Sequence, residues 1–207
     1  APEAYRKRAS YARHEAAAFR RKGLEKRARL LTDEIARRGL NGQSVLEVGS
    51  GVGGLLIELL RAGAERATGL ELSVASRAAA AALADELGFA GRVDYRPENI
   101  AAEGDAVPPA DVVILDRVIC CYPDMPPLVG QAAAHARRLL ALTYPVTAWY
   151  MRVFRFCANF FSAVMGWEYR FFLHPPAQIA AIVQAGGLRP VFQQRHSIWN
   201  VTVYERG

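Results

Sequence analysis

Short apolar runs alternate with longer runs of helical periodicity through the middle of the chain. A glycine-rich turn leads from the first apolar run into the helical run "GLLIELLRAG", and Ser73 can cap a second helix that ends near Gly88. Strands and helices that alternate at this spacing form a parallel sheet with helices on both faces. The apolar runs that predict strands are 44–50, 66–72, 92–96, 111–116 and 139–144.

The C-terminal part of the chain breaks this alternation. A predicted helix at 175–186 is followed by two strand-like runs, 187–197 and 198–206, with no room for a helix between them. Two strands joined by a tight turn pair antiparallel. The sequence therefore predicts an α/β, Rossmann-like three-layer fold: a seven-stranded, mostly parallel sheet with an antiparallel C-terminal hairpin.

The N-terminal region predicts an amphipathic helical arm over 3–38, either one helix or two separated at Gly23, with a C-cap at Gly39. This arm carries the basic surplus, since residues 1–39 hold 12 Lys and Arg against 5 Asp and Glu in a chain whose formal net charge is +6. A solvated helical face is the first interpretation, and an anionic substrate or membrane surface is the alternative. No zinc spacing or aromatic ribonucleoprotein motif accompanies the charge, so we expect no nucleic acid.

The cysteines indicate the compartment. Cys120 and Cys121 are adjacent, Cys157 is alone, and no C-x-x-C spacing or secretory signal is present. These features predict a cytoplasmic protein without a structural metal site.

The apolar run 146–167 is the only membrane-like segment, and Arg152 and Arg155 interrupt it, which argues against a spanning helix. Its aromatic residues surround the helix instead of forming one stripe. Such a helix is expected to be buried on most sides or to cover something apolar. Three interpretations stay open: a lid or wall for a hydrophobic substrate, core or dimer packing, and membrane-surface contact. The aromatic residues are Trp149, Tyr150, Phe154, Phe156, Phe160, Phe161 and Trp167.

The turn "VLEVGSGVGG" carries the first candidate chemistry. Its glycines fit both G-x-G-x-x-G, typical of dinucleotide sites, and E-x-G-x-G-x-G. Glu47 decides between them, because a carboxylate at the end of the strand repels phosphates and attracts a cationic ligand. S-adenosylmethionine has two cationic groups and no phosphate. Glu71, at the end of the next strand, can accept both hydroxyls of a ribose.

The segments "VLEVGSGVGG", "ATGLELS" and "DVVILDRVIC" resemble signature segments of class I S-adenosylmethionine-dependent methyltransferases, over roughly residues 44–206. The resemblance implies that the glycine loop lies under the methionine moiety and that Glu71 holds the ribose. It implies that Asn99 and Ile100 flank the adenine, and that Asp116 lies near the methionine moiety or the acceptor. The remaining cofactor contacts that it implies are Gly49, Ser50, Gly51, Gly53 and Leu72.

At a finer level, "RRKGLEKRARLL", "LDRVICCYPD", "LTYP" and "FFLHPP" resemble magnesium-protoporphyrin IX O-methyltransferases. That family tends to carry His before the "YP" pair, where this chain has Cys121, which favours a different acceptor. The resemblance implies a single methyltransferase domain over 1–207 that methylates a small hydrophobic or aromatic molecule, with O-methylation favoured. Its parts are a helical arm or lid (1–40), a cofactor core (41–145), an acceptor-side insertion (146–176) and a C-terminal hairpin region (177–207).

Two residues are candidates for catalysis. His174, in "FLHPP", can act as a general base if the acceptor arrives protonated, and Tyr11 on the arm can bind the cofactor carboxylate or the acceptor. Structural roles for both remain open. The alternatives to this function are a thiol or metalloid methyltransferase that uses the cysteines, an inactive cofactor-binding partner subunit, and a nicotinamide oxidoreductase. The sequence leaves the oligomeric state open.

Overall fold

A computed structural model describes residues 9–166 and 170–207 of the chain. The predicted helix residues 3–8 and Trp167 of the apolar run lie outside these ranges. One seven-stranded sheet has the order β3-β2-β1-β4-β5-β7-β6. The strands are β1 (Ser44–Val48), β2 (Arg66–Leu70), β3 (Val93–Arg96), β4 (Ala110–Asp116), β5 (Ala136–Pro145), β6 (Leu188–His196) and β7 (Trp199–Arg206).

The sheet confirms the predicted fold class. Strands β1 to β5 are parallel, β7 is antiparallel to β5, and β6 is antiparallel to β7. The hairpin turn between β6 and β7 contains Ser197, which has a left-handed φ of 56°. The helices are α1 (Ala9–Lys22), α2 (Lys26–Arg37), α3 (Gly54–Arg61), α4 (Val74–Glu86), α5 (Ile100–Glu103), α6 (Met125–His135), α7 (Trp149–Val164) and α8 (Pro176–Ala185).

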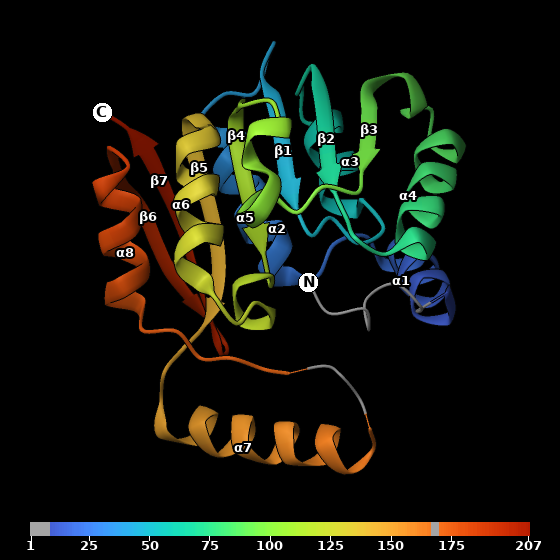
Figure 1. The fold of residues 1–207 in the computed structure, drawn as a ribbon. Helices are drawn as coiled ribbons and strands as arrows, with labels where there is room; N and C mark the ends of the chain where they lie inside the picture. Colours follow the sequence, from blue (N-terminus) through green and yellow to red (C-terminus); the bar gives the residue numbers. More distant parts are fainter. Residues whose placement is uncertain (1–8, 167–169) are drawn as a thin grey trace.

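Helices cover both faces of the sheet (Figure 1). On one face, α5, α6 and α8 pack on the inward side chains of β4 and β5, with Leu128 and Ile179 fully buried. On the other face, α2 and α3 bury Ile35 and Leu56, and α4 joins them through Leu83. Because β1, β4 and β5 are buried on both sides, they read as continuous apolar runs instead of alternating ones.

Local signals fixed most element ends. Gly23 separates α1 from α2 with φ 64°, and Gly39 follows α2 with φ 86°, conformations that favour glycine. The Ser73 hydroxyl accepts a hydrogen bond from the Ser76 N–H at 3.2 Å and caps α4 as expected. Strand β5 begins at Ala136 instead of near 139, because Ala136 pairs with Ala110 of β4, whereas the pairing with β7 begins only at Leu139.

Helix α7 departs from expectation. In Figure 1 it lies apart from the two helical layers, below the edge of the sheet where β1 and β4 end. Within α7 only Met151 and Ser162 are buried, and the aromatic side chains are exposed, with Phe156 at 71%. The helix is therefore not buried on most sides, and its buried apolar residue, Met151, joins a cluster with Val146 and Phe171. The other expectation, that the helix covers something apolar, stays a prediction. None of the helices in the described ranges combines the length and apolar character needed to cross a membrane.

Candidate functional site

The carboxyl ends of β1, β2 and β4 meet at one edge of the sheet, where the order of the strands reverses and where α/β folds bind ligands. The turn after β1 is built from glycines in the left-handed region: Gly49 at φ 70°, Gly51 at 55° and Gly53 at 74°. The N–H groups of Gly49 and Ser50 donate to the Leu70 carbonyl at 2.7 and 3.1 Å. The turn is thereby fixed against the end of β2.

Glu71 links the glycine turn to the start of α4. Its carboxylate accepts the Gly51 N–H at 3.0 Å and the Ser73 N–H at 2.8 Å, one on each oxygen. Burial raises the pKa of Glu71, and these two hydrogen bonds oppose the rise. Each carboxylate oxygen keeps a further lone pair for a hydroxyl donor.

Three buried polar atoms beneath the turn have no hydrogen-bond partner among the described residues: Glu47 Oε2, Ser50 Oγ and Tyr95 Oη. Glu47 is only 4% exposed. Burial, followed by the negative charges of Asp116, Glu15 and Glu71, raises the pKa of Glu47 well above its usual value. An unpaired buried carboxylate is costly, so this group is poised for a cationic partner.

Glu47 is the most buried member of an acidic cluster. Burial also raises the pKa of Glu15, on α1. The five carboxyl groups of the cluster outnumber the three guanidinium groups that interact with them, those of Arg27, Arg77 and Arg117. Its carboxylates, which interact electrostatically with one another or with these arginines, are Glu15, Glu25, Glu47, Glu71 and Asp116.

Asp116, at the end of β4, is held from two sides. Arg27, itself 4% exposed, donates a short hydrogen bond to its carboxylate, and the Thr143 hydroxyl donates at 2.5 Å. The next residue, Arg117, adopts a left-handed φ of 58°, and its N–H donates to Thr143 Oγ1 at 2.9 Å. Burial lowers the pKa of Arg117, but the charges of Asp116, Glu25, Tyr11 and Glu15 raise it overall.

The N-terminal arm lies against the glycine turn. A side chain at Gly51 would come within 3.3 Å of Glu15 Oε2, and one at Gly54 within 2.7 Å of the Phe19 ring. Tyr11 is half-exposed on α1 and interacts electrostatically with Arg117. The structure therefore brings Tyr11 to the same edge as the acidic cluster.

The predicted adenine contacts have structural roles as well. The Asn99 side chain accepts the Ala101 N–H at 3.3 Å, which caps α5, and donates to the Tyr122 hydroxyl at 3.1 Å. Ile100 is fully buried in the core, so only its backbone is available to a ligand. Leu72 is half-buried just after β2.

His174 lies beside the loop that follows β4. One ring nitrogen, Nε2, is 3.0 Å from the Tyr122 carbonyl, which can only accept, so Nε2 carries the proton of the neutral ring and Nδ1 is left basic. The Phe172 ring stacks on the imidazole with 6.2 Å between centroids. No contact joins His174 to the acidic cluster among the described residues, so its catalytic role stays a prediction.

A wall of apolar side chains lies where this loop, α7 and the segment before α8 meet. The hydrogen bond with Cys121 and burial both raise the pKa of Cys120, whose Sγ lies 3.8 Å from Cys121 Sγ. A thiol held in its protonated form is a weak nucleophile, which disfavours chemistry on Cys120. Cys157 is exposed on α7. The wall comprises Cys120, Cys121, Val146, Ala148, Met151, Phe171, Leu173, Ile198 and Trp199.

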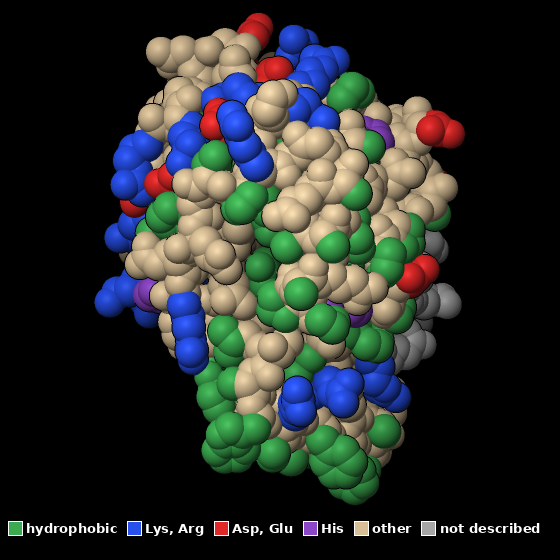
Figure 2. All heavy atoms as spheres, turned by 90° about the vertical axis from the view of Figure 1, so that its left-hand side faces the viewer, with side chains coloured by type: hydrophobic (Ala, Val, Ile, Leu, Met, Phe, Trp, Pro, Cys, Tyr) green, Lys and Arg blue, Asp and Glu red, His purple; other side chains and the backbone are tan. Residues whose placement is uncertain are grey.

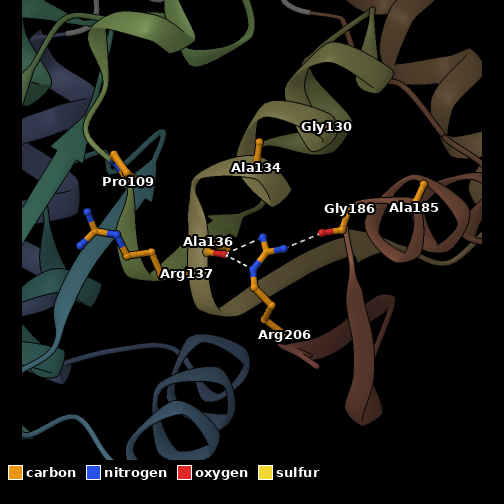
Figure 3. Close-up of a pocket in the computed structure, with 8 residues that line it drawn as sticks. All are labelled: Pro109, Gly130, Ala134, Ala136, Arg137, Ala185, Gly186 and Arg206. Carbon is orange, nitrogen blue, oxygen red and sulfur yellow. Dashed lines mark hydrogen bonds between the residues drawn. The ribbon is translucent and has the colours of Figure 1, made fainter.

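An open hollow of about 570 Å³ lies at the opposite edge, at the amino ends of β4 and β5. Figure 3 shows Arg206 crossing it toward the carbonyls of Ala136 and Gly186, to which its guanidinium donates at 2.8 to 3.0 Å and 2.7 Å. The guanidinium is occupied by carbonyl groups that join β5 to the turn after α8. Arg206 therefore has a structural role in the hollow, which lies at the opposite end of the strands from the acidic cluster.

Several residues near the acidic cluster were not identified as site residues from the sequence. Arg27 has a usable signal, because it shares the i, i+4, i+8 stripe of Leu31 and Ile35, where an apolar residue is expected. Tyr95 also has a signal, because it lies two residues after Val93 in a strand and so shares the face of the sheet with that apolar residue. Glu15, Glu25 and Arg117 have no such signal, because only the packing of α1 and α2 onto the sheet brings them together.

The comparisons with known proteins identify the family. A family model described as "Methyltransferase domain" matches residues 19–195, most of the chain. The chain belongs to this methyltransferase family. It is a class I S-adenosylmethionine-dependent methyltransferase by its sheet topology and its family, as the sequence resemblance predicted.

Solved structures share the fold of the methyltransferase at low identity. Magnesium protoporphyrin IX methyltransferase from Synechocystis PCC 6803, crystallised with bound SAH (S-adenosylhomocysteine), is 21% identical with a TM-score of 0.71, covering 87% of this chain and 82% of that one. An O-methyltransferase family protein from Burkholderia thailandensis is 20% identical with a TM-score of 0.72, covering 100% of this chain and 64% of that one. No curated protein sequence matches the chain significantly.

The described residues fit S-adenosylmethionine. The glycine turn exposes backbone to a close ligand, and the acidic surplus with its unpartnered Glu47 oxygen suits a ligand that bears an ammonium and a sulfonium. Phosphates of a dinucleotide would meet like charge at the same place. The hydride-transfer alternative therefore has no support at this site.

We expect Glu47→Gln to weaken S-adenosylmethionine binding about 10- to 100-fold, the range for losing one charge-assisted interaction. Isothermal titration calorimetry measures the change. Glu58→Gln, at a surface pair with Arg61 on α3, is the matched control and should bind normally. If both variants bind S-adenosylmethionine with the affinity of the wild-type protein, Glu47 does not contribute to cofactor binding.

The stability of the free methyltransferase should depend on Glu47 and pH. Its raised pKa means that the folded state holds the proton more tightly than the unfolded chain. The resulting stabilisation is complete below the unfolded value near 4.5 and is lost as pH rises through the folded value. Glu47→Gln should thus flatten the fall in unfolding free energy with pH, measured by urea titration between acidic and mildly alkaline buffers. A slope as steep as that of wild type would contradict this.

Proposed function

We propose that this methyltransferase transfers the methyl group of S-adenosylmethionine to an oxygen of a small, hydrophobic or aromatic molecule. The observation that carries the proposal is the apolar wall beside the acidic edge. Met151 on α7 and Phe171 in the segment before α8 both belong to it, together with Cys120 of the loop after β4. An apolar acceptor would lie between this wall and the cofactor turn.

The described residues divide into two groups of roles. Glu47, Glu71 and the turn Gly49–Gly53 hold the cofactor, which supplies an electrophilic methyl group on its sulfonium. Residues of the wall exclude water and orient the acceptor, and positioning of this kind accounts for much of the rate of a displacement with a good leaving group. His174 Nδ1 takes the proton of an acceptor hydroxyl.

Several structural neighbours are named as O-methyltransferases, beside a putative sarcosine dimethylglycine methyltransferase and a putative RNA methyltransferase. They include mitomycin 7-O-methyltransferase, 18% identical with a TM-score of 0.63, and an O-methyltransferase from Planctomyces limnophilus in complex with apigenin, 16% identical with a TM-score of 0.63. At such identity the likeness to each concerns the fold, so the acceptor is a matter for direct assay.

A panel of carboxylate, phenol, amine and thiol acceptors tests the proposal, with S-adenosylhomocysteine formation as the readout. We expect turnover with apolar phenols or carboxylates and little with polar amines. Turnover confined to thiols, and lost in Cys120→Ala/Cys121→Ala, would favour the thiol alternative. Tight cofactor binding with no turnover on any acceptor would favour an inactive partner subunit.

A further inference from the structure

Helix α7 carries an exposed apolar face that the methyl-transfer site does not use. We propose that this face docks the protein on the surface of a membrane that contains anionic lipid, with the helix lying in the interface. Five side chains define the α7 face. They are Trp149, Val153, Phe156, Phe160 and Val164, each between 54% and 76% exposed.

The α7 face is continuous. At 3.6 residues per turn its five side chains fall within an arc of about 80° around the helix. Clusters of exposed aromatic and aliphatic side chains of this kind mark interaction surfaces, whereas isolated ones are ordinary. Figure 2 shows hydrophobic side chains gathered at the lower end of the molecule, where α7 lies in Figure 1.

The opposite side of α7 is fastened to the body, which fixes the direction of the α7 face. The Asn159 amide donates to the Phe171 carbonyl at 2.9 Å, and its oxygen accepts the Phe171 N–H at 2.7 Å. Phe154 packs edge-on against the Phe171 ring with 5.5 Å between centroids. Arg195 donates to the Tyr150 hydroxyl at 2.6 Å. The helix is therefore held so that the α7 face points outward.

Positively charged side chains on and beside α7 favour a membrane surface with anionic lipid. Arg195 donates to the Tyr150 hydroxyl of α7, and the described residues of this helix include no Asp or Glu. Arg152 and Arg155 are exposed on α7 itself, and within the described part of the chain their guanidinium groups form no ion pair. In Figure 2 Lys and Arg side chains border the hydrophobic end. Aromatic groups flanked by arginines suit an anionic headgroup layer.

A second copy of the chain fits the α7 face less well. In a two-fold dimer the same surface meets itself, so α7 would face α7. The arginines of both copies would then gather at one interface, and no carboxylate on the described residues of α7 is there to pair with them. A lipid headgroup layer supplies the missing negative charge.

Docking through α7 would also orient the site. The helix lies on the side of the sheet where the parallel strands end (Figure 1), and its buried Met151 belongs to the apolar wall. If the proposed function holds, an apolar acceptor could pass from the bilayer to the site over a short path. Membrane binding itself does not depend on methyl transfer and is measured without it.

Vesicle flotation tests the docking proposal. We expect the protein to float with vesicles of phosphatidylcholine containing about 30% phosphatidylglycerol, less with phosphatidylcholine alone, and less as salt rises. Trp149→Gln/Phe156→Gln/Phe160→Gln should lower vesicle binding about 10-fold or more. Arg152→Gln/Arg155→Gln should lower binding to the anionic vesicles about fivefold for each arginine.

Val74→Gln is the matched control, since Val74 is an apolar residue of α4 and 60% exposed. It should float like wild type. All variants should keep their circular dichroism spectrum and calorimetric affinity for S-adenosylmethionine, because the replaced side chains are exposed. Failure of wild type to float with anionic vesicles, or flotation of the triple variant equal to wild type, would overturn the proposal. A wild-type dimer that the triple variant dissociates, with no vesicle binding, would assign the α7 face to a second copy.

Discussion

Arg27→Met is expected to lower the free energy of unfolding by about 3–5 kcal/mol, the cost of leaving one partner of a buried ion pair alone. The Arg27 guanidinium bonds Asp116, lies 3.5 Å from Glu25 Oε2, and lies over the Trp199 ring at 5.5 Å from its centroid. Methionine keeps much of the volume but none of these contacts. Asp116 would keep the Thr143 hydroxyl and, at 4.0 Å, the Arg117 guanidinium, which also pairs with Glu15 and Glu25. Urea denaturation at neutral pH measures the loss.

Two comparisons make the Arg27 result specific. Arg20→Met removes a partner of the exposed pair with Glu86 and should change stability little, because surface pairs contribute little. The double variant Arg27→Met/Asp116→Asn should regain a large part of the lost stability, since the unpaired charge is gone. A loss in Arg27→Met no greater than that in Arg20→Met would show that the buried pair is not a main support of α2 on the sheet.

His174→Ala is expected to lower kcat about 100-fold or more with a hydroxyl acceptor, the lower range for loss of a general base. The reason is the hydrogen bond from Nε2 to the Tyr122 carbonyl, which leaves Nδ1 as the basic nitrogen. Binding of S-adenosylmethionine should be unaffected. Steady-state turnover, with calorimetry for cofactor affinity, separates the two effects.

Chemical rescue distinguishes a base from a loop residue at this position. Added imidazole should restore part of the activity of His174→Ala, and an acceptor that is already ionised should show little loss. His14→Ala, at an exposed position on α1, should behave like wild type. Full turnover of His174→Ala with a phenol would leave His174 as a residue that only orders the segment before α8.

The sequence predicted the fold because its signals are local. Periodicity located the strands, Ser73 and Gly39 marked helix ends, and the lack of space for a helix before the last strand implied the hairpin. The glycine turn and Glu47 were found in the same way, since backbone conformation and one misplaced charge can be read from a few adjacent letters.

The rest of the site depends on contacts between distant segments. Glu15 and Arg117 lie about 100 residues apart, yet they approach within 3.6 Å because α1 packs over the cofactor turn. The exposure of α7 also could not be predicted from the sequence, because an apolar helix can have the same sequence whether it packs in a core or faces outward. Ile100 shows the converse, because its position after β3 suggested a ligand contact and its side chain is buried in the core.

We infer that the site selects a cationic cofactor through its buried carboxylates. Calorimetric titration of the wild-type protein with S-adenosylmethionine, and separately with NADH, tests this most directly. We expect saturable binding of S-adenosylmethionine that strengthens from acidic to mildly alkaline pH as Glu47 ionises, and no heat of binding from NADH. Two results would contradict this inference: saturable binding of NADH, or an affinity for S-adenosylmethionine that falls between acidic and mildly alkaline pH.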